Sequence, residues 1–297
     1  MTRASDVVDP AVDAQRQELL LSWYSDVGRD LPWRRTRDPY AVLVSEVMLQ
    51  QTQVARVMPR YEAWLERWPT AEALAAASGA EVLGEWSGLD YNSRALRLHA
   101  AAKAVAEQGW PIDEAGLRAH PGVGPYTAAA VAAFALRLPA VAVDTNQQRV
   151  IDRWDGAVGR SMGEVRTRAL ELLPADAPDA WNHALMDLGA TVCTARVAAC
   201  DDCPMAAACS SAGLVDPVAE RALRAGAGKP TVRFEDTARF VRGRIVAALV
   251  DAGSLDRAQL RDVIPAGIDD TRIADAIDGL TRDGLVVDEA GRLALPE

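Results

Sequence analysis

Apolar residues recur every three or four positions over most of the chain, which is the spacing of helices that bury one face. The alternating pattern of a half-buried strand is nearly absent before residue 285. The chain is therefore predicted to be all-α, with helices over residues 71–77, 92–108, 127–136, 145–154, 163–173 and 179–188.

One more helix is predicted to open at Asp38-Pro39, because aspartate is a favoured N-cap and proline suits the first turn. Its apolar stripe is predicted to comprise Val44, Val47, Met48, Val54 and Met58. Such a stripe would place Glu46, Gln50 and Gln53 together on another face of the same helix.

The last part of the chain has a different organisation. Apolar residues show no regular spacing over residues 213–232, which are interpreted as a linker. Helices are predicted over residues 237–252, 256–263 and 270–283, followed by two short strands about a glycine turn within 285–295. This order suggests a small winged-helix-like domain over residues 233–297. Its third helix carries four aspartates against two arginines, so a protein-docking or packing role is at least as well supported as DNA binding.

Composition places the chain among water-soluble proteins. It has 297 residues, 49% of them hydrophobic, which suffices for one large or two modest domains. The longest apolar run, residues 128–136, is far shorter than the roughly 18 residues of a membrane helix. The first residues lack the apolar stretch of a signal peptide. We therefore expect a cytoplasmic monomer with no membrane partner.

The net charge of −10 argues against a nucleic-acid partner, because phosphate binding depends on clustered cations. The cations are unevenly distributed, however. Residues 29–60 hold six arginines against three acids, and residues 91–103 hold three cations and no acid. Positive potential is thus concentrated locally, with a solvated surface as the alternative interpretation.

All four cysteines fall within seventeen residues, at Cys193, Cys200, Cys203 and Cys209. Disulfides are not expected in a cytoplasmic chain, which leaves ligation of zinc or of an iron–sulfur cluster. Zinc sites usually pair two Cys-x2-Cys knuckles, and only one such spacing occurs here. The spacing therefore favours a 4Fe-4S cluster, with zinc as the alternative.

The segment His120-Pro-Gly-Val-Gly-Pro-Tyr126 precedes an alanine-rich helix. Gly122, Val123 and Gly124 offer backbone amides that can converge on a phosphate at the helix N-terminus. The pattern is typical of a helix-hairpin-helix that holds DNA without reading its sequence, and an ordinary glycine turn is the alternative.

Two carboxylates are notable for their context. Glu46 lies among Val44, Val47 and Met48, where an apolar environment disfavours the charged form and suits a general acid. Asp144 follows a Val-Ala-Val segment and precedes a helix, so that an N-cap role is the alternative to a functional one.

Five features of the chain share one resemblance. They are Leu31-Pro-Trp-Arg34, Ser45-Glu-Val-Met-Leu-Gln-Gln-Thr-Gln53, Pro121-Gly-Val-Gly-Pro-Tyr-Thr127, Val143-Asp-Thr-Asn146 and the cysteine spacing. Together they resemble the MutY-type adenine DNA glycosylases of the endonuclease III superfamily. The resemblance covers roughly residues 20–210, and its second segment and the cysteines are the specific parts.

The resemblance implies a two-lobed helix-hairpin-helix glycosylase core over residues 1–212, with a six-helix barrel near 30–137 and an iron–sulfur lobe made of 1–29 and 138–212. Its partner would be double-stranded DNA with a mispaired or damaged base. Adenine opposite 8-oxoguanine or guanine would be flipped into a pocket and its N-glycosidic bond hydrolysed in base excision repair.

The resemblance also implies roles for single residues. Glu46 would protonate adenine at N7, Asp144 would stabilise the oxocarbenium-like sugar, and Asn146 would orient that carboxylate. Tyr126 occupies the position of the lysine found in lyase members, so no AP-lyase activity is expected. Contacts to DNA or to the flipped base would come from Trp33, Arg34, Gln50, Gln51, Thr52, Tyr91, Arg94, Gly122, Val123, Gly124 and His183.

Several positions depart from the family pattern. Gly88-Leu-Asp-Tyr-Asn92 puts Asp90 and Asn92 where the family has other residues. His183 stands where Gln or Glu often reads the adenine edge, and an imidazole that titrates near neutral pH would make base discrimination pH-sensitive. The usual C-terminal 8-oxoguanine-recognition domain is expected to be absent, with residues 233–297 in its place.

Two alternatives remain open at this stage. The same chemistry could act on another base, such as thymine or uracil opposite guanine, or an alkylated purine. The chain could instead be a non-enzymatic iron–sulfur regulator that binds DNA.

Overall fold

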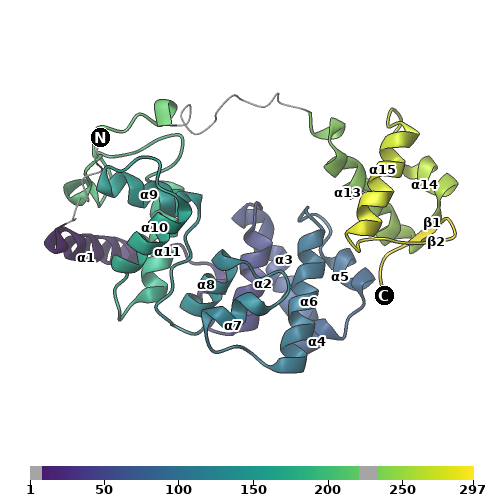
Figure 1. The fold of residues 1–297 in the computed structure, drawn as a ribbon, viewed down its shortest axis with the longest axis horizontal. Helices are drawn as coiled ribbons and strands as arrows, with labels where there is room; N and C mark the ends of the chain where they lie inside the picture. Colours follow the sequence, from purple (N-terminus) through teal and green to yellow (C-terminus); the bar gives the residue numbers. More distant parts are fainter. Residues whose placement is uncertain (1–8, 221–232) are drawn as a thin grey trace. The chain divides into compact units, whose positions relative to one another are not determined.

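A computed structural model of the chain describes residues 9–220 and 233–297. It is mostly helical, with one small sheet near the C-terminus (Figure 1). The chain forms two compact units. One comprises Met1–Pro39, Ile112–Leu117 and Gly124–Gly228, and the other comprises Tyr40–Pro111, Arg118–Val123 and Lys229–Glu297. Among the described residues, no helix combines the length and the apolar character that a bilayer span requires.

The first unit is built from helices and short 3-10 turns. Its elements are α1 (Pro10–Val27), η1 (Pro32–Arg34), α8 (Pro125–Phe134), α9 (Thr145–Asp155), α10 (Met162–Glu171), α11 (Pro178–Thr191) and η2 (Ala206–Ala208). Helix α7 (Glu114–Ala119) begins in this unit and ends in the other.

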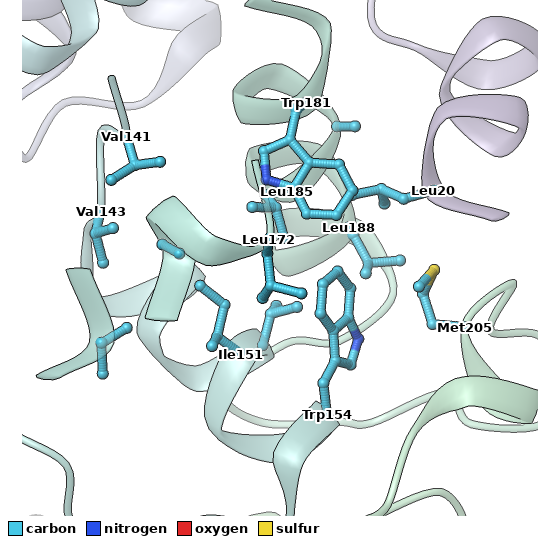
Figure 2. Packing of buried hydrophobic residues seen from close by; sticks show 14 residues of the cluster. Leu20, Val141, Val143, Ile151, Trp154, Leu172, Trp181, Leu185, Leu188 and Met205 are labelled. Atoms are coloured by element: carbon cyan, nitrogen blue, oxygen red, sulfur yellow. The ribbon is translucent and has the colours of Figure 1, made fainter. Parts of the chain in front are cut away.

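Figure 2 shows the core of the first unit, where Leu20 of α1 meets residues of α9 and α11. The rings of Trp154 and Trp181 are centred 6.1 Å apart and tilted, and both side chains are buried. Met205 extends this core to the cysteine segment, where Cys203 also packs against it. The apolar core thus supports the segment that carries the four cysteines.

A buried ion network lies beside this core. Arg16 of α1 is 1% exposed and donates to Asp155 at 2.7 Å and to the carbonyl of Ala208 at 2.9 Å. Asp155 also accepts from Arg160 at 2.8 Å and from Arg168 at 3.0 Å. The network connects α1, the end of α9, α10 and the cysteine segment.

The second unit is also mainly helical. Its elements are α2 (Pro39–Leu49), α3 (Val54–Arg67), α4 (Ala71–Ala75), α5 (Gly79–Glu85), α6 (Ser93–Gln108), η3 (Phe234–Asp236), α13 (Ala238–Ala252), β1 (Ser254–Asp256), α14 (Arg257–Val263), α15 (Asp270–Arg282), β2 (Val287–Glu289) and β3 (Arg292–Ala294). Trp64 is fully buried between Trp68 and Trp86, with edge-on ring centroids at 4.7 and 5.5 Å.

The stripe predicted across residues 44–58 is wrong in its second half. Helix α2 ends at Leu49, a turn follows, and Val54 begins α3. Gln50 and Gln53 therefore do not share a helix face with Glu46. Residues 40–48 of α2 are all buried. A helix that is buried on all sides has no single apolar face, so the spacing of its apolar residues does not show where the helix ends.

The other predicted helices are confirmed, with ends that differ by a few residues. The three C-terminal helices and the following hairpin are confirmed as well. The pattern missed α1, α3 as a separate helix, α5, α7 and the three-residue strand β1. Strand β1 pairs antiparallel with β3, so that the sheet order is β1-β3-β2. In the predicted linker, residues 217–220 are helical, and residues 221–232 lie outside the described residues.

Candidate active site

Asp144 stands at the amino end of α9, in the first unit, directly after the buried residues 141–143. Its Oδ1 accepts hydrogen bonds from the backbone N–H groups of Asn146 and Gln147, both at 2.8 Å. Its Oδ2 accepts from Nδ2 of Asn146 at 3.0 Å. The N-cap and the contact from Asn146 are thus both present, and together they fix the orientation of the carboxylate.

Asn146 is held in turn by Arg149, which is 3% exposed and donates from Nη1 to Oδ1 of Asn146 at 3.0 Å. Nε of Arg149 donates to the carbonyl of Cys193 at 3.0 Å, and Nη2 to the carbonyl of Gly189 at 2.8 Å. A Cβ at Gly189 would lie 3.2 Å from the Cβ of Asn146, so glycine permits this close packing. Hydrogen bonds therefore connect the carbonyl of Cys193, the first of the four cysteines, through Arg149 and Asn146 to Asp144.

The four cysteines line one small cavity together with Arg153 and Trp154. Nη1 of Arg153 donates to Sγ of Cys193 at 3.2 Å. Burial, assisted by the neighbouring thiols, raises the pKa of Cys203 to about 11. A metal that binds Cys203 must therefore displace its proton.

The donor set of these four thiols is suitable for a metal centre, because thiolates ligate both zinc and iron–sulfur clusters. Within the described residues, no group of three or more His, Cys, Asp or Glu side chains is already placed to hold a metal ion.

Glu46 lies in the second unit, on the buried helix α2, and is itself 5% exposed. The turn that follows α2 contains Gln50, Gln51 and Thr52, of which Gln51 is exposed and the other two are half-buried. Gln51 has a left-handed backbone, with φ of +57°. Such a conformation costs roughly 1 kcal/mol or more in a residue other than glycine and is enriched at functional sites.

Arg94 holds this turn from α6 and is 5% exposed. Its Nη1 donates to the carbonyls of Val47 and Gln50 at 2.8 and 2.6 Å. Its Nη2 donates to the carbonyl of Leu89 at 2.7 Å and to Oγ1 of Thr52 at 3.0 Å. The guanidinium of Arg94 thus shapes the turn after α2 and the segment that contains Tyr91, and its contact with DNA stays a prediction.

The second of these segments, residues 88–92, contains Tyr91, whose φ is +48° and whose side chain is partly exposed. Asp90 has a φ of +61° and pairs with Arg56 at 3.2 Å. The acid that departs from the family pattern is therefore neutralised by a neighbouring arginine. The contact of Tyr91 with DNA stays a prediction.

The hairpin before α8 contains a tight turn at Gly122, and its contact with phosphate stays a prediction. Gly122 has a φ of +73°, and a Cβ there would lie 2.5 Å from Cβ of Arg97, so only glycine fits. The N–H of the buried Val123 donates to the carbonyl of His120 at 3.2 Å. Gly124 is the N-cap of α8 and provides no side-chain cap. Tyr126 lies half-buried in the first turn of that helix.

Trp33 and Arg34 are engaged within the first unit. Trp33 is 5% exposed, and Arg34 forms two parallel hydrogen bonds of 2.8 Å with Asp187. Burial alone would raise the pKa of Asp187, but its hydrogen bonds with Arg34 and Arg29 outweigh this effect and lower it. The contacts of Trp33 and Arg34 with DNA stay predictions.

His183 stacks on Phe134, with ring centroids 4.0 Å apart and an angle of 16° between the planes. Burial, and then the positive charge of Arg34, lowers the pKa of His183 to about 3. The imidazole is therefore neutral throughout the physiological range. The expectation that it titrates near neutral pH is wrong, while its contact with the adenine edge stays a prediction.

The residues that sequence reasoning missed are mainly Arg149, Arg153 and Asp187. Their signals were nevertheless in the sequence. Arg149 and Arg153 lie three and seven positions after Asn146, which puts all three on one face of a helix. Asp187 is a charge within an otherwise apolar helical stretch, where a buried partner is required.

The comparisons with known proteins give these residues a context. Residues 44–175 match the model of the HhH-GPD superfamily of base excision DNA repair proteins. The adenine DNA glycosylase of Mycolicibacterium smegmatis is 45% identical over 289 residues, which cover 93% of this chain and 94% of the relative. This chain belongs to the adenine DNA glycosylases. Because the match spans 93% of the chain, it includes most of the C-terminal segment as well.

Two solved structures share the glycosylase fold. A thermostable thymine-DNA glycosylase matches with a TM-score of 0.65 at 28% identity, covering 69% of this chain and 99% of that chain. A non-covalent endonuclease III–DNA complex matches with a TM-score of 0.61 at 22% identity, covering 70% of this chain and 98% of that chain. The predicted helix-hairpin-helix glycosylase fold is thereby confirmed.

Proposed function

We propose that this glycosylase hydrolyses the N-glycosidic bond of adenine mispaired with 8-oxoguanine or guanine in double-stranded DNA. The supporting observation is the geometry of Asp144, whose carboxylate accepts three N–H hydrogen bonds at the amino end of α9. Negative charge is stabilised at that end of a helix. A carboxylate already held in place needs no reorganisation when positive charge develops on the sugar.

The two carboxyl groups divide the chemistry. Glu46 donates a proton to N7 of adenine, and the bond between N9 and C1′ breaks with its electron pair moving to the base. Asp144 stabilises the oxocarbenium-like sugar, water adds to C1′, and a proton from that water restores the acid form of Glu46. The 5% exposure of Glu46 supports the acid role, because bulk water is excluded from its carboxyl group.

The reaction stops at base removal. A Schiff-base lyase requires an amine nucleophile, and the hairpin carries Tyr126 where lyase relatives carry lysine. The chain has two lysines, Lys103 and Lys229. Lys103 is exposed on α6, outside the hairpin, and Lys229 lies outside the described residues.

The four cysteines are proposed to hold a 4Fe-4S cluster that fixes the segment from Cys193 to Cys209. Their shared cavity and their place within one segment support this assignment. Purified protein should absorb broadly near roughly 400 nm and contain about four irons per chain. One zinc per chain and no iron would rule the cluster out.

A panel of duplexes tests the reaction, with adenine opposite 8-oxoguanine or guanine, thymine or uracil opposite guanine, and an alkylated purine. We expect adenine release and strand cleavage only after alkali, with no borohydride-trapped adduct. Glu46→Gln and Asp144→Asn should each lower release at least about 100-fold while lesion binding is largely retained.

Each alternative predicts a different result in this panel. Release of another base with adenine untouched would establish the changed-base function. Tight binding without any release would favour the non-enzymatic regulator.

A further inference from the structure

A cavity of about 480 Å³ lies within the second unit, between residues 83–93 and the C-terminal segment. Tyr91 lines the cavity on the side formed by residues 83–93. Phe234, Arg239 and Arg244 line it on the side formed by the C-terminal segment. Volumes of this order accommodate small organic ligands. The mechanism above uses neither this cavity nor the C-terminal residues.

The cavity is electropositive although the chain carries a net charge of −10. Its charged lining residues are three arginines and one acid, Asp90. Asp90 already pairs with Arg56, and Arg242 pairs with Asp283. Arg239 and Arg244 therefore supply the positive charge, and Arg244 makes no hydrogen bond or ion pair with any residue that the structure describes.

Aromatic rings surround one of these charges. The guanidinium carbon of Arg239 lies 4.9 Å from the ring centroid of Tyr91 and 5.0 Å from that of Phe234. Arg239 also donates a hydrogen bond to the hydroxyl of Tyr91. Phe234 in turn meets Phe240 edge-on at 5.5 Å. Among the described residues, Tyr91 is the one hydrogen-bond partner of Arg239, so other donors of its guanidinium are free for an anion.

We propose that this cavity binds one nucleotide of the DNA substrate, with its base against the exposed ring of Phe234 and its phosphate between Arg239 and Arg244. The inference rests on the proposed function only in taking DNA as the ligand. Rings stack on any base, and guanidinium groups recognise phosphate oxygens, so the site would bind without reading sequence. The C-terminal segment thereby becomes part of the DNA-binding surface through α13 and η3, and its acidic helix α15 is not required.

The test is the salt dependence of binding to a duplex with 2′-fluoro-2′-deoxyadenosine opposite 8-oxoguanine, in which fluorine slows base loss. Because the two arginines share one phosphate, Arg244→Gln and Arg239→Gln should each lower the magnitude of the slope of log K against log salt by up to about 0.9. Each should weaken binding roughly 5- to 10-fold at 0.1 M salt. Arg282→Gln is the matched control, because Arg282 is exposed in the same segment and does not line the cavity.

The variants separate nucleotide binding from a purely structural contact. If Arg239 only holds the C-terminal segment on Tyr91, then Arg239→Gln lowers stability and Arg244→Gln behaves like Arg282→Gln. That outcome overturns the proposal. The binding assay does not depend on base release. If the wild-type protein fails to release adenine, the proposed function is rejected, and the nucleotide site is still tested by the binding of the arginine variants.

Discussion

Replacing Arg149 by methionine should impair base release through Asn146. The substitution keeps much of the apolar stem and removes the donors to Asn146, Gly189 and Cys193. Hydrogen bonds from charged groups contribute about 1.5–3 kcal/mol each, and the loss of one partner leaves buried acceptors unpaired. Three acceptors lose their donor at a cost of about 1–3 kcal/mol each, so we expect a loss of at least about 3 kcal/mol in the free energy of unfolding.

The effect on the reaction follows from the same contacts. Without Arg149, the amide of Asn146 loses its support, and Oδ2 of Asp144 loses a fixed donor. Small displacements of a catalytic group can cost about 100-fold in rate, so we expect base release to slow roughly 10- to 100-fold. The assay is single-turnover release of adenine opposite 8-oxoguanine, with enzyme in excess and below the melting temperature of each variant.

A double-mutant cycle shows whether Arg149 acts through Asn146. If it does, the double variant Arg149→Met with Asn146→Ala should be no slower than the slower single variant. Arg168→Met is the stability control, because Arg168 pairs with Asp13 and Asp155 in the same unit and touches neither Asn146 nor a cysteine. Folded Arg149→Met that releases adenine at the wild-type rate, or rate losses that multiply in the double variant, would refute the reasoning.

Three further predictions concern the rest of the first unit. His183→Gln should leave the pH dependence of base release between about pH 5.5 and 7.5 unchanged, because the imidazole of the folded protein is neutral there. It should also reduce the loss of stability below about pH 6.5, where the wild-type histidine is protonated only on unfolding. A flattened pH profile of base release would contradict this prediction. Asp155→Asn should destabilise the protein more at pH 7 than at pH 3 in urea unfolding. Burial alone would raise the pKa of Asp155, but its hydrogen bonds with Arg168 and Arg160 outweigh burial and lower that pKa in the folded state. The contribution of Asp155 to the free energy of unfolding is therefore present above its unfolded-state pKa and lost as the pH falls through its folded-state pKa. An equal loss of stability in Asp155→Asn at both pH values would contradict this linkage. Cys200→Ser should lower the iron content and the solubility of the protein, and an unchanged iron content would remove Cys200 from the ligand set.

The sequence by itself determined the elements and much of the candidate chemistry. The helical period, the N-cap at Asp144 and the glycines of the hairpin act within a few residues of chain, so they can be recognised without tertiary structure. The four cysteines and the motifs around Glu46 also lie in single segments. They led to the adenine DNA glycosylase family, which the relatives confirm.

Tertiary structure alone decided what the arginines do. Arg34 and Arg94 were predicted to contact DNA, and in the structure each guanidinium donates to acceptors supplied by other parts of the chain. Arg34 pairs with Asp187, 153 positions away, and Arg94 binds backbone carbonyls more than 40 positions away. The sequence shows that a residue is cationic but not whether its side chain binds phosphate, a carboxylate or the end of a helix. Its role is set by desolvation and by the nearest acceptor, and both depend on how distant segments pack.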